Sequence, residues 1–138
     1  MIAWGPGSFQ NEEGNDWIDE LVESQDLSSI VLALQSIVEF AGTEDLEAQD
    51  CACAIVACEV VATAGGNPAK DLPKKLRKFI EEMAIGVTAP VQSLAAKTLE
   101  KVKQTPAMLR QFKEAGTLDE WLDNIEGLER RIAEAAIA

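Results

Sequence analysis

The stretch from residue 4 to residue 17, WGPGSFQNEEGNDW, constrains the fold more than any other part of the chain. The Gly-Pro-Gly run at residues 5–7 excludes both a helix and a regular strand, because glycine permits positive φ whereas proline fixes its own φ and restricts the residue before it. Residues 1–10 are therefore predicted to form an irregular arm. Trp4 and Phe9 can each bury about 150–250 Å² of surface, so we expect the arm to pack on the body of the protein.

A helix is predicted to begin directly after this arm. Asn11 occupies an N-cap position, and Glu12 and Glu13 fall in the first turn, where free amides and the positive end of the helix dipole favour carboxylates. From Trp17 onward, apolar and acidic side chains separate onto opposite faces at helical spacing. We expect the apolar face to point into the core.

These opening residues resemble domain of unknown function family 4259, small bacterial proteins that begin with a Trp-Gly-x-Gly-x-Phe-x-Asn-Asp-x-Ala-x-Asp-Trp-like signature. Glu12 replaces the usual aspartate, and Gly14 replaces the usual alanine. The segment 109–132, which places Trp121 in a charged amphipathic helix, is similar to the C-terminal end of the family. The matching positions of the signature are Trp4, Gly5, Gly7, Phe9, Asn11, Asp16 and Trp17.

The resemblance implies domain boundaries and a fold, but it brings no established activity. Because some members are encoded near bacterial toxin systems, it also implies an immunity-like role. In one interpretation the signature is architectural: its three aromatic side chains pack together, and Asn11 and Asp16 accept hydrogen bonds from amides of the arm. In the other, glycine-rich amides and exposed aromatics form a recognition surface for a peptide or small anion. The candidate binding residues are then Trp4, Gly5, Gly7, Phe9, Asn11, Glu12, Asp16 and Trp17.

Helical periodicity and helix-capping residues recur along the rest of the chain, whereas strand-like alternation is hard to find. We predict one all-α domain over residues 1–138, a compact bundle of about six or seven helices with the arm packed on it. An α-solenoid-like stack of helix pairs is the alternative. The expected later helices run from an Asp26 cap to about Ala41, from a Thr43 cap to Ala64, from an Asp71 cap to Met83, from a Thr88 cap to about Lys103, from Thr105-Pro106 to Gly116, and from a capping box at residues 117–120 to Ile132.

The predicted helix from the Thr43 cap to Ala64 contains a run of small and apolar residues, Cys51 to Ala64, that is typical of a central helix. Glu59 is the single charged side chain in the run, and it is either a buried carboxylate of functional interest or part of a wet stripe. At 100° per residue it falls within about 60° of Glu44 and Asp45. We therefore predict the wet stripe.

Three cysteines share this predicted helix. Cys51 and Cys58 are about 10 Å apart along the axis, which is too far for a disulfide bond. The sequence has no histidine, so a zinc site would need four thiolates or additional carboxylates. We predict that Cys51, Cys53 and Cys58 are buried, unbonded thiols, and we expect neither a metal nor a cofactor.

The net charge of −12 is confined to the first half of the chain. Residues 1–69 contain 13 Asp and Glu and no Lys or Arg, whereas residues 70–138 contain 12 basic and 11 acidic side chains, which gives −13 and +1. Such a field repels nucleic acids and anionic membranes and favours basic partners. The basic cluster at residues 74–78 is predicted to be solvated or to lie beside the acidic half. With no recognisable secretory signal or membrane span, a cytoplasmic location is expected.

Enzymatic activity is not expected, because the sequence offers no His or Tyr, no nucleotide-binding loop and no metal-binding motif. Carboxylates four residues apart, Glu12 with Asp16 or Asp16 with Glu20, leave a carboxylate-based metal or enzymatic site as an alternative. We predict a non-enzymatic acidic module, immunity-like, that binds a basic protein partner. A structural protein that self-associates into a homo-oligomer is a further alternative.

Overall fold

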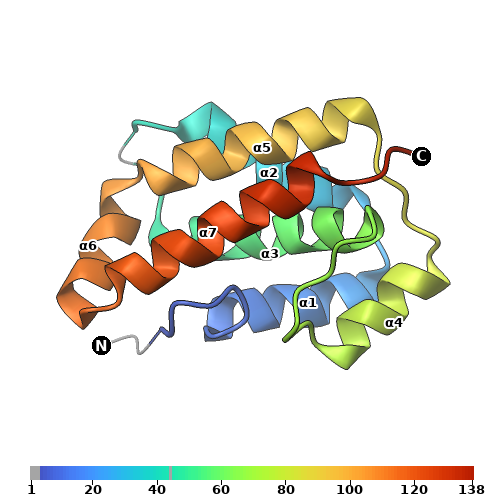
Figure 1. Ribbon diagram of the computed structural model, residues 1–138, viewed down its shortest axis with the longest axis horizontal. Helices are drawn as coiled ribbons and strands as arrows, with labels where there is room; N and C mark the ends of the chain where they lie inside the picture. Colours follow the sequence, from blue (N-terminus) through green and yellow to red (C-terminus); the bar gives the residue numbers. More distant parts are fainter. Residues whose placement is uncertain (1–3, 44) are drawn as a thin grey trace.

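The computed structural model describes residues 4–43 and 45–138, and this part of the chain forms seven helices without any strand (Figure 1). The prediction of a compact all-α bundle is therefore confirmed. No helix of the described residues is both long enough and apolar enough to cross a membrane. The helices are α1 (Glu12–Ser24), α2 (Ser28–Phe40), α3 (Ala48–Ala64), α4 (Lys74–Glu82), α5 (Ala89–Lys103), α6 (Pro106–Ala115) and α7 (Leu118–Ala133).

Helix α3 is the centre of the bundle, as its small residues predicted. It contacts each of the other six helices, and Figure 1 shows it running between α1 and α5, behind α7. Every side chain from Cys51 to Ala62 is buried except that of Cys53, which is half-buried. A helix enclosed on all sides needs no polar face, and small side chains allow its neighbours to approach closely.

The predicted start of α3 was wrong. The Thr43 hydroxyl donates to the Phe40 carbonyl at 2.7 Å and so closes the end of α2 instead of capping the next helix. Helix α3 begins five residues later, at Ala48. Its first turn is fixed by the Asp50 carboxylate, which accepts a hydrogen bond from the Glu47 amide at 3.0 Å.

Two other helix starts also differ from the prediction. Helix α4 begins at Lys74, after Pro73, so Asp71 lies outside it and does not cap it. Helix α7 begins at the predicted place, but the Thr117 hydroxyl is buried and makes no hydrogen bond with the described residues, so the predicted capping box does not form. The Thr88 cap of α5 is confirmed, since its hydroxyl accepts a hydrogen bond from the Val91 amide at 3.4 Å.

The arm packs against the bundle through its aromatic side chains, although residues 1–3 of the predicted arm lie outside the described residues. Trp4 and Phe9 are only 7 % and 9 % exposed. The backbone between them closes into a loop, in which the Gly5 amide donates to the Gln10 carbonyl at 2.9 Å. A Cβ on Gly5 would lie 2.8 Å from the Gln10 Cβ atom, which cannot move without the backbone, so this loop favours glycine there.

Glu59 is buried, at 1 % exposure, so the predicted wet stripe was wrong. Glu44, which entered that prediction, lies outside the described residues. Arg131 of α7 holds the carboxylate through two hydrogen bonds, from Nη1 to Oε1 at 2.8 Å and from Nη2 to Oε2 at 3.1 Å. Ser8 of the arm donates a third hydrogen bond to Oε2, at 2.6 Å. Three charge-assisted hydrogen bonds replace the water that the carboxylate loses on burial.

Two asparagines complete this arrangement, which we name the Glu59 cluster: Ser8, Glu59, Asn67, Asn124 and Arg131. Asn124 donates to the Ser8 hydroxyl at 3.0 Å. Asn67 donates to the Arg131 carbonyl at 3.0 Å, and Arg131 donates in return to the Asn67 carbonyl at 3.2 Å. The cluster therefore joins the arm, α3, the connection after α3, and α7.

Replacing Arg131 with Met is expected to lower the free energy of unfolding by about 3–5 kcal/mol, because it leaves the buried Glu59 carboxylate without its counter-charge. The double variant Glu59→Met/Arg131→Met should recover much of this loss, since it removes both charges. Urea unfolding at neutral pH measures the change. Arg130→Met, at the exposed neighbouring position of α7, is the matched control. An Arg131→Met protein as stable as this control would contradict the role assigned to the ion pair.

Candidate functional site

The signature residues fall in two places in the structure. Trp4, Gly5, Gly7 and Phe9 form the docked loop of the arm, whereas Asp16 and Trp17 lie on α1. Trp4 and Phe9 belong to the hydrophobic core, and Trp17 packs against it while remaining half-buried. Of the aromatic residues in the signature, Trp17 thus keeps the largest share of its surface in contact with solvent.

The asparagines of the signature region hold the junction between the arm and α1. The Asn11 side chain accepts a hydrogen bond from the Gly14 amide at 2.7 Å, which is the predicted N-cap. Asn15 was not singled out from the sequence, yet its side chain donates to the carbonyls of Phe9 and Asn11, at 3.0 and 2.9 Å. The interpretation that Asn11 and Asp16 accept hydrogen bonds from amides of the arm was therefore wrong. The arm is instead connected to α1 by the Asn15 side chain, which donates hydrogen bonds to backbone carbonyls.

Gly14, where the resemblance leads one to expect alanine, marks a close approach of two helices. It is buried, and a Cβ atom there would lie 2.9 Å from both Val56 Cγ2 and Asn11 Oδ1. Such distances require one of the neighbours to shift. The departure from the signature therefore allows α1 to lie close to α3 at this point, while Glu12, two residues earlier, stays exposed.

A groove lies between α1 and α3, and we name it the acidic groove. Its volume is about 240 Å³. Asp16 and Glu20, one of the predicted carboxylate pairs, both line it, and Trp17 lies between them in the sequence. Glu12, the partner of Asp16 in the other predicted pair, does not line it. The lining residues are Glu13, Asp16, Trp17 and Glu20 from α1 and Gln49, Asp50 and Cys53 from α3.

The four carboxylates of the acidic groove form no ion pair with any cation of the described residues. The Glu13 Oε2 atom is in addition buried without a hydrogen-bond partner among these residues. A buried carboxylate oxygen without a donor is costly, and this atom is closed to donors from solvent. The exposed carboxylates of Asp16, Glu20 and Asp50 are able to accept hydrogen bonds from an ammonium or a guanidinium group.

The pKa of the Cys53 thiol is affected by the negative charges of the acidic groove. It donates a weak hydrogen bond to the Glu13 carbonyl at 3.8 Å. Burial, followed by the negative charges of Asp50, Glu13, Glu20 and Asp16, raises the pKa of Cys53 to about 11. The thiol is therefore protonated at neutral pH and is a poor nucleophile.

The other two cysteines are buried and form no disulfide bond, as predicted. Burial raises the pKa of Cys51 to about 11 and that of Cys58 well above its usual value. Within residues 4–43 and 45–138, no three His, Cys, Asp or Glu side chains lie close enough together to hold a metal ion.

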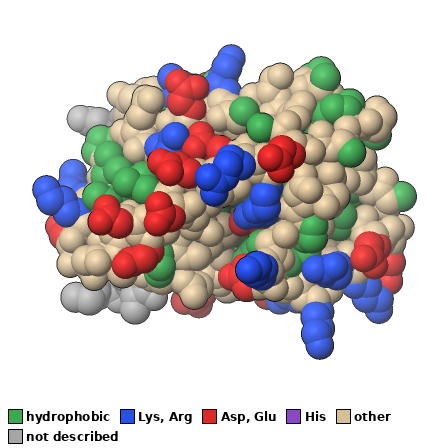
Figure 2. Space-filling model, in the orientation of Figure 1, with side chains coloured by type: hydrophobic (Ala, Val, Ile, Leu, Met, Phe, Trp, Pro, Cys, Tyr) green, Lys and Arg blue, Asp and Glu red, His purple; other side chains and the backbone are tan. Residues whose placement is uncertain are grey.

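The basic cluster of α4 lies beside the opposite side of α1. Helix α4 packs against α1, and Lys75 forms an ion pair with Asp19. Figure 2 shows Lys and Arg side chains gathered over α4 on the face that it displays. The acidic residues of α1 are therefore divided, since Asp19 faces a cation of the same chain whereas Asp16 and Glu20 face the acidic groove.

Comparison with known proteins places the chain in a family. No curated protein and no solved structure matched it. The family model described as "Domain of unknown function (DUF4259)" matches residues 3–124. This range contains the arm, both walls of the acidic groove and every member of the Glu59 cluster except Arg131. The match covers well over half of the chain, and the protein therefore belongs to the DUF4259 family.

Proposed function

We propose that this protein is a non-enzymatic acidic module that binds a basic protein partner at the acidic groove, in an immunity-like role. The observation that carries the proposal is the composition of the groove. Four carboxylates line it together with a half-buried tryptophan, and no cation of the described residues pairs with any of them. The groove thus supplies the counter-charges that a basic side chain needs.

A lysine or arginine side chain of the partner fits this groove in two ways. Its charged end forms charge-assisted hydrogen bonds with exposed carboxylates of the groove, which are those of Asp16, Glu20 and Asp50. Its position over the indole of Trp17 adds a cation–π interaction, of about 0.5–2 kcal/mol depending on how far the pair is removed from water. A tryptophan side chain has only two χ angles, so it anchors a partner at a low cost in conformational entropy.

The charge of the wider surface supports the same partner class. The first 69 residues carry −13, and 13 acidic side chains with no cation among them create a long-range negative potential. Such a potential accelerates the encounter with a basic protein and loses this effect as salt is added. The short contacts in the groove then supply the specificity.

Removing two charges from the groove is expected to reduce the capture of basic proteins from a native lysate at least about tenfold. The variant is Asp16→Asn/Glu20→Gln, in which both exposed side chains keep their size. Asp119→Asn/Glu120→Gln removes the same charge from the exposed first turn of α7 and is the matched control. Mass spectrometry of the captured proteins at about 50 and about 500 mM salt measures the effect. Equal capture by the two variants, or captured proteins of average charge, would refute the proposal.

Asp50→Asn is expected to lower the pKa of Cys53, because Asp50 is the strongest of the charges that raise it. Burial continues to hold the pKa above its usual value, so the fall is partial. The measurement is the rate of iodoacetamide labelling from about pH 8 to about pH 11 in a Cys51→Ala/Cys58→Ala background, where the thiolate reacts. Glu23→Gln, at the exposed end of α1, is the control. Identical labelling profiles for Asp50→Asn and this control would show that the carboxylate does not act on the groove.

A further inference from the structure

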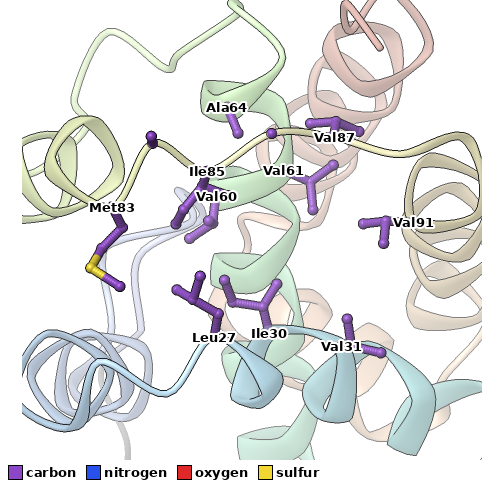
Figure 3. A pocket seen from close by; sticks show the side chains of 12 residues that line it. Leu27, Ile30, Val31, Val60, Val61, Ala64, Met83, Ile85, Val87 and Val91 are labelled. Atoms are coloured by element: carbon purple, nitrogen blue, oxygen red, sulfur yellow. The ribbon is translucent and has the colours of Figure 1, made fainter. Parts of the chain in front are cut away.

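A second concave site lies at the other end of α3 and shares no lining residue with the acidic groove. It has a volume of about 240 Å³, and its walls come from Leu27 and the first turns of α2, the end of α3, the connection between α4 and α5, and Val91. Figure 3 shows side chains from these facing segments pointing toward one another across it. We name it the apolar pocket, because all twelve lining residues are Ala, Gly, Val, Ile, Leu or Met.

One wall of the apolar pocket is a narrow strap, residues 83–87, that connects α4 to α5. Its residues alternate, so that Ile85 and Val87 are turned inward whereas Ala84 and Gly86 are exposed. Ala84 adopts a φ of +51°, a conformation that costs energy for any residue with a Cβ atom. Backbone hydrogen bonds hold the strap at both ends. The amides of Met83, Ala84 and Ile85 donate to the carbonyls of Phe79, Glu81 and Ile80 at 2.9, 3.1 and 3.3 Å, and the Val87 carbonyl accepts from the Ala138 amide at 2.8 Å.

The residues of α3 that face the pocket are small, although larger ones would fill it. Val60, Val61 and Ala64 form this wall. A hollow between aliphatic walls leaves their atoms without contacts on one side, which is unfavourable. Leucine or phenylalanine at these positions would remove that cost, so the small residues are consistent with space kept for a ligand.

We propose that the apolar pocket binds a small, neutral, apolar molecule about the size of a six-membered carbon ring or a short alkyl chain. An engineered cavity of about 150 Å³ with similar walls binds benzene, and this pocket is somewhat larger. No charged or hydrogen-bonding side chain lines it, so a ligand with a carboxylate or an ammonium group would lose its hydration without compensation.

The surroundings favour a small molecule over a protein partner. A protein that docked here would need a broad apolar core that extends beyond the pocket and is itself bounded by a polar rim. The large exposed apolar side chains of the described residues are Leu32, Phe40 and Ile137, and none of them lines the pocket. The apolar surface is thus concentrated inside the pocket.

The test is an NMR titration of the ¹⁵N-labelled protein with benzene and, in a second arm, with hexanoate. Benzene is expected to shift the amide signals of Ile30, Val61 and Ile85 in a saturable way, with a Kd of about 1 mM or below, whereas hexanoate leaves them unchanged. Ala64→Leu fills the pocket and should weaken benzene binding at least about tenfold. Val91→Phe fills it from the opposite wall and serves as the second variant. Ala96→Leu, on the exposed face of α5, is the matched control and should bind as the unmodified protein does.

Three results would overturn the proposal. The first is the absence of saturable shifts at the pocket amides of the unmodified protein. The second is undiminished benzene binding by both filled variants, and the third is tighter binding of hexanoate than of benzene. Because the pocket and the acidic groove share no lining residue, each of these results leaves the capture experiment on the groove unaffected.

Discussion

The buried ion pair between Glu59 and Arg131 determines how the N-terminal part of the chain is attached to the rest. A carboxylate at 1 % exposure needs a counter-charge and hydrogen-bond donors. The counter-charge comes from α7, and one donor comes from Ser8 of the arm. The arm is thereby fixed to α3 and α7 at once, and it leads directly into α1 through the Asn11 cap. The position of α1, which provides one wall of the acidic groove, thus depends on a pair of charges between α3 and α7.

The parts of the fold that the sequence predicted correctly are those with a local physical cause. The helix caps at Asn11, Thr88 and Gly116 are formed by contacts within three or four residues. A short stretch of sequence therefore contains both partners of each capping hydrogen bond. Thr43 and Thr117 show the limit of such reasoning. The Thr43 hydroxyl lies between two helices and forms its hydrogen bond with the end of the earlier one, α2. The Thr117 hydroxyl is buried without a hydrogen-bond partner among the described residues.

Long-range partners explain why the site could be predicted only in part. Helical geometry placed Glu59 near acidic neighbours of its own helix, but its real partner is 72 residues away, and nothing local in the sequence identifies Arg131. The acidic half and the Asp16-Trp17 pair were visible as a charge pattern and a signature. The opposite wall of the groove was not, because Gln49 and Cys53 become neighbours of α1 only when it approaches α3 at Gly14.

The small residues of α3 account for the core and for both concave sites. Six helices can surround one only if its side chains are short, and α3 meets this condition with Ala, Cys and Val along its buried length. Short side chains also leave space wherever two surrounding helices diverge. Near its N-terminal end that space lies beside the carboxylates of α1, and near its C-terminal end it lies beneath the aliphatic strap. The same packing requirement therefore produces a charged groove and an apolar pocket, and the chemistry of each is set by the segment that covers it.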